Sequence, residues 1–326
     1  MNILVTGGAG YIGSATAEAL LAGGHQVIVY DSLVTGHRAA APEGARFIQA
    51  DLSDSHALAE AITDQKLDAI MHFAAFIEAG ESMKDPGRFY HNNFTNSLVL
   101  IESAIRAGVK RFVLSSTAAV FQSSDGPLTE DSPLGPTNVY GHTKLLIEET
   151  LEWYRQIHGL RYAALRYFNA SGALPGRGED HQPESHLIPL VLRVPLGEME
   201  SANIYGTNYP TPDGTCIRDY IHIADLVSAH LLALDALGEH DRLVYNLGSG
   251  IGYSVREVIE TARQVTGHPI PVNELPRRPG DSARLVASSE KIKRELGWKA
   301  QHDNLQEIIA SAWQWHKSHP NGYAEK

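Results

Sequence analysis

The sequence has 326 residues, of which 43 % are hydrophobic and 20 % are charged, and its formal net charge is −11. A chain of this length and composition can bury a large core and is typical of a soluble globular protein. The negative balance argues against nucleic acid or an anionic membrane as a partner, and no apolar run is long enough to span a bilayer. The single cysteine, Cys216, cannot form an internal disulfide. Together with the lack of an apolar leader segment, this predicts a reducing, cytoplasmic location.

The chain opens with a pattern of strand, glycine turn and helix. Ile3-Leu4-Val5 is typical of a buried strand, residues 15–21 are typical of a helix, and the turn between them contains Gly7, Gly10 and Gly13. Glycine lets the backbone approach a pyrophosphate closely, and the start of a helix directs free N–H groups at phosphate oxygens. The pattern therefore predicts a dinucleotide site, although a glycine triplet alone is weak evidence.

An acidic residue strengthens this interpretation. The next apolar run, residues 26–30, ends at Asp31, close to the distance of about 20 residues from the glycines that dinucleotide sites show. A carboxylate at this place can accept hydrogen bonds from the ribose hydroxyls of the cofactor and would repel a 2′-phosphate. We therefore expect NAD rather than NADP.

Short apolar runs alternate with amphipathic stretches through the first half of the chain. Strands are expected at 46–49, 69–73, 111–114 and 161–165, and helices at about 55–63, 84–107 and 139–158. This alternation predicts β-α-β crossovers and a doubly wound parallel sheet, in which ligands lie beyond the carboxyl ends of the strands.

The pattern changes after Phe168. Residues 173–183 are rich in glycine, proline and charge, which indicates a loop that leaves the sheet. Further helices are expected at 187–196, 224–237, 256–266 and 305–317, with a strand at 243–246. We expect a first domain at residues 1–170 and a smaller second domain at 171–326, with about 223–250 returning to the main sheet.

A tyrosine and a lysine form the strongest catalytic candidate. Tyr140 and Lys144 are four residues apart on the helix expected at 139–158, so their side chains share one face. A nearby ammonium group and the positive nicotinamide ring of bound NAD both favour the phenolate, which makes Tyr140 usable as a general acid or base. Ser115-Ser116-Thr117 follows the strand expected at 111–114, where a hydroxyl can bind the same substrate oxygen. Taken alone, the Y-x-x-x-K spacing is more typical of a surface pair, and the run of three hydroxyl residues is equally typical of a helix cap or turn.

Further segments stand in a recognisable order along the chain: Arg166-Tyr167-Phe168-Asn169, R-D-Y-I-H at 218–222, Tyr245-Asn246-Leu247-Gly248 and R-R-P-G-D at 277–281. With the glycine turn and Y-x-x-x-K, essentially the whole chain resembles the extended short-chain dehydrogenase/reductase superfamily and, within it, the UDP-glucose 4-epimerase family. The resemblance implies an α/β fold with a Rossmann-type doubly wound parallel sheet and a smaller C-terminal α/β domain for the nucleotide sugar. It also implies tightly bound NAD and the 4-epimerisation of a UDP-hexose through a transient 4-keto intermediate.

The resemblance assigns roles to individual residues. Tyr140 would be the acid and base, Lys144 would hold the nicotinamide ribose and lower the tyrosine pKa, Thr117 would bind the sugar 4-oxygen, and Ser115 would support it. The implied cofactor contacts are Gly7, Gly10, Tyr11, Ile12, Gly13, Asp31, Asp51, Leu52, Phe73, Ala74, Ala75, Asn93, Ser115, Tyr140, Lys144 and Tyr167. The implied substrate contacts are Thr117, Tyr140, Asn169, His186, Leu187, Ile204, Tyr205, Arg218, Tyr220, Arg278, Asp281 and Leu285. The histidines show no metal-ligand spacing, so no metal is expected.

Several positions depart from the family pattern. Ile77 stands where some relatives carry a lysine, Phe121-Gln122 replaces Tyr-Gly, and His186 replaces an asparagine that contacts the substrate. Leu285 falls where side-chain bulk is expected to control the entry of N-acetylated sugars, so their acceptance stays open, as does that of pentose sugars. The family also implies a homodimer that forms through the two long helices.

Three other functions occur on such a fold and can be compared with these residues: a dehydratase, a net oxidoreductase and a cofactor-sensing binding protein. A 4,6-dehydratase needs a pair of acid–base carboxyl groups directly after Thr117, where this chain has Ala118-Ala119. A net oxidoreductase would release reduced cofactor. A cofactor-sensing binding protein on the same fold often lacks the tyrosine or the lysine, and both are present here.

Overall fold

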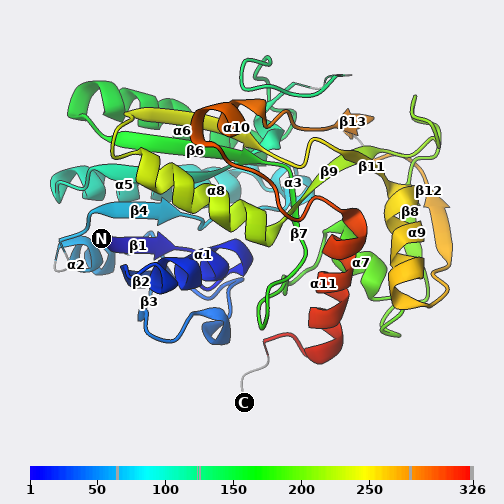
Figure 1. The fold of residues 1–326 in the computed structure, drawn as a ribbon. Helices are drawn as coiled ribbons and strands as arrows, with labels where there is room; N and C mark the ends of the chain where they lie inside the picture. Colours follow the sequence, from blue (N-terminus) through cyan, green and yellow to red (C-terminus); the bar gives the residue numbers. More distant parts are fainter. Residues whose placement is uncertain (64–65, 123, 125, 279–280, 324–326) are drawn as a thin grey trace.

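A computed structural model of the chain describes residues 1–63, 66–122, 124, 126–278 and 281–323. A parallel seven-stranded sheet with the order β10-β6-β5-β4-β1-β2-β3 forms its larger part (Figure 1). The strands are β1 (Asn2–Thr6), β2 (Gln26–Asp31), β3 (Arg46–Gln49), β4 (Ala69–His72), β5 (Arg111–Thr117), β6 (Arg161–Tyr167) and β10 (Arg242–Leu247). The doubly wound parallel sheet expected from the alternating pattern is therefore present.

Helices cover both faces of this sheet because successive strand residues point to opposite sides. Ile3 and Val5 pack into one core together with helix residues such as Leu20 and Leu226. Leu4 packs into the other core. The first face carries α1 (Tyr11–Ala22), α8 (Ile223–Ala236) and α10 (Glu290–Leu296), and the second carries α2 (Ser55–Thr63), α5 (Asn96–Arg106) and α6 (Val139–His158). Strand β10 pairs in parallel with β6, so the chain returns to the main sheet after it has left it.

A smaller part lies beyond the carboxyl ends of the strands (Figure 1). Its sheets have the orders β11-β9-β13, with β7 paired to β9, and β12-β8. The strands are β7 (Asn169–Ser171), β8 (Ala202–Tyr205), β9 (Ile217–His222), β11 (Gly252–Ser254), β12 (Val272–Leu275) and β13 (Arg284–Leu285). The helices are α7 (Leu187–Leu192), α9 (Val255–Thr266) and α11 (Leu305–Ser318), which share a separate apolar core with β8 and β9.

Several expected elements differ from the structure. The helix expected at 187–196 ends at Leu192, and the strand expected at 161–165 continues to Tyr167. The single helix expected at 84–107 consists of α4 (Pro86–Phe89), a π-helical stretch at Tyr90–Thr95 and α5. The strand expected to end at 114 continues to Thr117, because the three hydroxyl residues still pair with β6. The remaining short helices are η1 (Arg38–Ala40), α3 (Ala79–Ser82) and η3 (Ala118–Val120). Among the described residues, no helix combines the length and apolar character needed to cross a membrane.

Candidate active site

The glycine turn between β1 and α1 forms a cradle that leaves no room for side chains at two positions. Gly7 has a φ of +71°, and a Cβ there would lie 2.5 Å from the backbone nitrogen of Ala74. A Cβ on Gly13 would lie 2.1 Å from the carbonyl oxygen of Gly7. At Gly10 the nearest atom to an added Cβ would be 3.4 Å away. The turn is thus closely packed on the protein side and open toward the N-terminus of α1, as a phosphate site requires.

Asp31 ties the end of β2 to this turn. Its Oδ2 accepts the N–H of Ala9 at 2.9 Å and its Oδ1 accepts the N–H of Leu33 at 2.8 Å. Burial raises the pKa of the Asp31 carboxyl group, and the two backbone hydrogen bonds act in the opposite direction. Each carboxylate oxygen keeps a second acceptor site, so Asp31 can still accept a ribose hydroxyl.

A cavity of about 300 Å³ collects nearly all the expected cofactor residues. Its walls include Gly7, Gly10, Tyr11, Ile12, Gly13, Asp31, Asp51, Leu52, Phe73, Ala74, Ala75, Ser115, Tyr140, Lys144 and Tyr167. They come from segments that follow neighbouring strands, from the start of α1 and from α6. We refer to this space as the cofactor cleft.

Asn93 is an exception, because it does not line the cofactor cleft. Its amide group is fully buried in the π-helical stretch, where it accepts the N–H of Phe76 at 2.9 Å and donates to the Phe76 carbonyl at 2.9 Å. It also donates to Thr143 Oγ1 on α6 at 3.3 Å. Asn93 therefore fixes the segment after β4, and its neighbour Asn92 is the residue that lines the cleft.

The candidate catalytic side chains meet where α6 crosses the end of β5. Asn138 caps α6 by accepting the N–H of Gly141 at 2.8 Å, and Tyr140 and Lys144 follow on the face toward the sheet. Thr117 hydrogen-bonds the Tyr140 phenol, and the Ser115 hydroxyl makes a very short hydrogen bond with the Tyr167 hydroxyl. The arrangement places one phenol and one threonine hydroxyl within reach of a single substrate oxygen.

Burial has the largest effect on the pKa values of both Tyr140 and Lys144. It raises the pKa of Tyr140 to about 12, and the hydrogen bond with Thr117 opposes this shift. Burial lowers the pKa of Lys144 to about 8, against the opposing charge of Glu148.

The expected direct effect of Lys144 on the tyrosine is not seen. The ammonium group instead donates to the Ser115 carbonyl at 2.8 Å. In the protein alone, Thr117 is the group that favours the phenolate.

A second cavity of about 480 Å³ adjoins the cofactor cleft and contains most of the expected substrate residues. Its walls include Asn169, His186, Leu187, Tyr205, Arg218, Tyr220, Arg278 and Asp281. Tyr11, Asn169 and His186 line both spaces, so the two are continuous. We refer to the second space as the substrate cavity.

Two arginines give the substrate cavity positive charge. The guanidinium group of Arg218 lies 3.4 Å from the carboxylate of Asp281, and that of Arg278 lies 3.8 Å from the ring centre of Tyr205. Arg277 and Arg278 are described, whereas Pro279 and Gly280 of the same segment lie outside the described residues. Paired guanidinium groups of this kind match the oxygens of a diphosphate.

Two expected substrate residues do not line either cavity. Ile204 is 1 % exposed and belongs to the apolar core of the smaller part, while its neighbours Asn203 and Tyr205 line the substrate cavity. Leu285 packs against the cluster of Val120 and Phe121. Strand alternation accounts for Ile204, since adjacent residues point to opposite faces.

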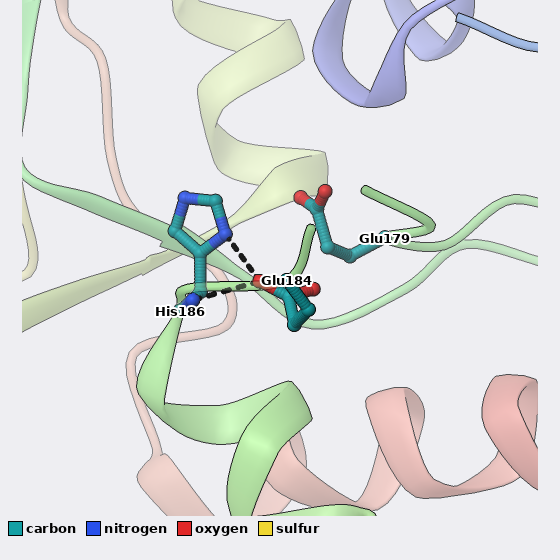
Figure 2. A group of neighbouring side chains, drawn as sticks. All are labelled: Glu179, Glu184 and His186. Carbon is teal, nitrogen blue, oxygen red and sulfur yellow. Dashed lines mark hydrogen bonds and ion pairs between the residues drawn. The ribbon is translucent and has the colours of Figure 1, made fainter. Parts of the chain in front are cut away.

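A cluster of titratable groups lies at the junction of the two cavities, and the sequence singled out only one of its members, His186. Figure 2 shows Glu179, Glu184 and His186, with His186 bonded through its Nδ1 and its backbone N–H to Glu184 at 2.8 and 2.7 Å. Burial raises the pKa of Glu179 to about 7.

The two neighbouring carboxyl groups favour the charged form of His186. Burial acts to lower the pKa of His186, but the hydrogen bond with Glu184 and the charge of Glu179 outweigh it and raise the pKa to about 9. One ligand atom of each of these three residues lies within 4.8 Å of the others, which is close enough for a metal. The Glu184–His186 hydrogen bond already uses two of these atoms, so we interpret the group as part of the substrate cavity.

The chain is similar to known proteins over its whole length. Residues 3–248 match the NAD dependent epimerase/dehydratase family. A UDP-glucose 4-epimerase from Halalkalibacterium halodurans is 50 % identical over 99 % of this chain and 98 % of its own. A crystal structure of a UDP-glucose 4-epimerase superposes with a TM-score of 0.96, at 48 % identity and with full coverage of both chains. That of the Bifidobacterium longum UDP-glucose 4-epimerase, in complex with NAD⁺ and UDP, has a TM-score of 0.94 at 36 % identity, over 99 % of this chain and 100 % of its own.

Proposed function

The chain belongs to the NAD dependent epimerase/dehydratase family and, within it, to the UDP-glucose 4-epimerases, so its activity is the NAD-dependent 4-epimerisation of a UDP-hexose. We propose the following roles for its residues in this reaction. The observation that carries the proposed mechanism is the position of Tyr140 and Thr117 in the cofactor cleft, which adjoins a cavity with two arginines.

The residues of the cofactor cleft fit NAD. The tightly packed glycine turn and the start of α1 suit a pyrophosphate, and Asp31 suits the adenosine ribose. Lys144 and Tyr140 would lie beside the nicotinamide ribose. When bound, NAD accepts a hydride from C4 of the sugar and returns it, and its positive ring favours the Tyr140 phenolate.

Tyr140 moves the proton. As general base it takes the proton of the sugar 4-hydroxyl, which leaves a 4-keto sugar in the cavity, and as general acid it returns that proton to the opposite epimer. Thr117 holds the 4-oxygen by a hydrogen bond, and Ser115 and Tyr167 support the wall behind it.

The substrate cavity recognises the nucleotide. Arg218 and Arg278 bind the diphosphate, Asp281 accepts the uridine ribose hydroxyls, and Asn169, Leu187 and Tyr220 line the space for the sugar and the base. A diphosphate held at a distance from C4 lets the 4-keto sugar turn without leaving, so that the other face can meet the cofactor. His186 supports the negative diphosphate with the charge that its raised pKa gives it.

The test is turnover of UDP-galactose by the purified protein without added NAD. We expect UDP-glucose to form with no accumulation of NADH, because the cofactor is regenerated in each cycle. Accumulation of NADH would indicate a net oxidoreductase, and loss of water from the sugar would indicate a dehydratase. The same assay across UDP-glucose, UDP-N-acetylglucosamine and UDP-xylose defines which sugars the cavity accepts.

We further propose a homodimer that forms through α6. Trp153 and Ile157 are four residues apart on this helix and have exposed fractions of 62 % and 68 %. Two large, exposed apolar side chains on one helix face suit the centre of an isologous interface. The free, buried Cys216 supports a reducing compartment, and we propose the cytoplasm.

A further inference from the structure

The segment after β7 crosses the cofactor cleft. In Figure 1 the green chain after β7 runs down beside the blue N-terminal elements. Four successive residues of this segment, Gly178 to His181, line the same cleft as the glycine turn and Asp31. We call residues 177–181 the crossing segment. Its contacts fix it on both sides of the cleft.

On the side of β2 the crossing segment is held by an arginine and a histidine. Arg177, which is buried, donates to the Glu18 carboxylate on α1 and to the Ala40 carbonyl through two very short hydrogen bonds. His37 Nε2 donates to the Asp180 carbonyl at 2.8 Å and lies 3.4 Å from the Asp180 carboxylate. The backbone N–H of His37 in turn donates to the Ala9 carbonyl of the glycine turn at 2.9 Å.

On the side of β4 the crossing segment is held by an ion pair. His181 Nε2 lies 2.9 Å from the carboxylate of Glu78, and the side chains are 10 % and 15 % exposed. The hydrogen bond from His181 is the main cause that lowers the pKa of Glu78 to about 2, and the same bond raises the pKa of His181. The bond thus favours the charged form of both side chains and joins segments 103 residues apart in the chain.

Tyr323 and Trp315, from the C-terminal part of the chain, also contact the crossing segment. The Tyr323 hydroxyl accepts the N–H of Gly178 at 3.0 Å, and the Tyr323 N–H donates to the Asp180 carboxylate at 2.9 Å. The Tyr323 ring stacks on His37 with 5.4 Å between ring centres. A Cβ on Gly178 would lie 2.2 Å from the ring of Trp315, so the backbone is pressed against α11 at this point.

We propose that residues 177–181 are part of the cofactor site and form a strap that retains the dinucleotide between turnovers. The Glu78–His181 and His37–Asp180 bonds hold the strap closed. This inference rests on the proposed NAD-dependent function, which needs a cofactor that stays bound through many cycles. Because the dinucleotide must pass the strap to leave, the Glu78–His181 and His37–Asp180 bonds must break first. Each of these bonds therefore slows the release of the dinucleotide.

The experiment measures NAD release directly. Wild-type protein loaded with NAD is diluted into an NAD-degrading enzyme, and the NAD still bound is followed with time. The test variants are His37→Phe, which keeps a ring against Tyr323 but removes the donor, Glu78→Gln, which keeps the size but removes the charge, and their combination. The control is His56→Phe, at a side chain on α2 with an exposed fraction of 85 %.

We expect about tenfold faster release for each single variant, as the loss of one charge-assisted or buried hydrogen bond predicts, and a larger effect for the combination. His56→Phe should release NAD as slowly as the wild type. Release within twofold of wild type from both single variants, with unchanged circular dichroism, would overturn the strap while leaving the proposed function intact. Wild-type protein that retains no NAD would overturn both.

Discussion

Tyr140 shows how the position of a residue sets its acidity. A pKa of about 12 leaves almost all of this phenol protonated at neutral pH. Thr117 opposes burial but does not outweigh it, and the Lys144 ammonium is directed at the Ser115 carbonyl. Deprotonation at neutral pH therefore needs positive charge that the protein alone does not bring to the phenol. The acid–base role that we propose for Tyr140 thus depends on the bound cofactor.

His186 gives a pH-dependent prediction. Glu184 bonds its Nδ1, Glu179 and Glu78 contribute negative charge, and the pKa is raised to about 9. A raised pKa keeps the imidazole protonated below this value, and the charge is lost as the pH rises through it. We expect the KM for UDP-galactose to rise severalfold between about pH 8 and pH 10 because the diphosphate loses a cationic partner.

The measurement is the pH profile of KM and kcat for the wild type and for His186→Asn. The variant should have a higher KM at pH 7 and a flatter KM profile, while the titration of Lys144, with a pKa of about 8, continues to affect kcat. An unchanged KM profile in His186→Asn would show that another group carries the pH dependence.

Helix α6 is the element that joins catalysis to stability. Tyr140, Lys144 and Glu148 recur every four residues on the face toward the sheet. Glu148 accepts a fork of hydrogen bonds from Arg166 on β6, at 3.0 Å from Nε and 2.6 Å from Nη2, and both side chains are buried. The same pair that anchors the helix therefore also holds the candidate catalytic side chains in position above β5.

We predict that Glu148→Ala lowers the free energy of unfolding by about 3–5 kcal/mol, because it leaves a buried guanidinium group without its partner. The matched control is Glu149→Ala, which changes the exposed neighbour on the same helix and should cost less than about 0.5 kcal/mol. Urea denaturation followed by circular dichroism measures both. Equal stabilities of the two variants would contradict the assigned role of the ion pair.

The elements also show which parts of the site local sequence can predict. Periodicity predicted α6 with its bounds, and hence the shared face of Tyr140 and Lys144. It ended β5 too early, because Ser115 to Thr117 are polar although they pair within the sheet. The roles of Asn93, Ile204 and Leu285 depended on their partners, namely a distant loop, the core of the smaller part and the Phe121 cluster. Contacts between residues far apart in the sequence leave no periodic pattern in it.

At the scale of the whole molecule, the cofactor cleft and the substrate cavity are one continuous space. The alternating pattern predicted the sheet and its ligand edge. The crossing segment was expected only as a loop, since its ion pair with Glu78 joins residues 103 positions apart. This continuity gives the proposed 4-keto sugar room to turn between the cofactor and the arginines.

The proposed dimer gives a prediction at the same scale. The exposed pair Trp153 and Ile157 on α6 should be covered by a second copy, because burial of two large apolar side chains favours association. Wild-type protein should sediment as a dimer at micromolar concentration, and Trp153→Asp should shift it toward the monomer. The control Ile251→Asp, at an exposed apolar residue with an exposed fraction of 42 %, should remain dimeric. A monomeric wild type would contradict this interface.

In the proposed mechanism, the Tyr140 phenol carries the proton in both directions. The most direct measurement is the rate of UDP-galactose conversion by Tyr140→Phe, at NAD occupancy matched to the wild type. Tyr154→Phe, which removes a hydroxyl on the same helix, is the control. We predict a loss of about a hundredfold or more for Tyr140→Phe, the usual contribution of a general acid–base group, and wild-type turnover for Tyr154→Phe. Turnover by Tyr140→Phe within a few-fold of the wild type would contradict the role of Tyr140 as the acid–base group.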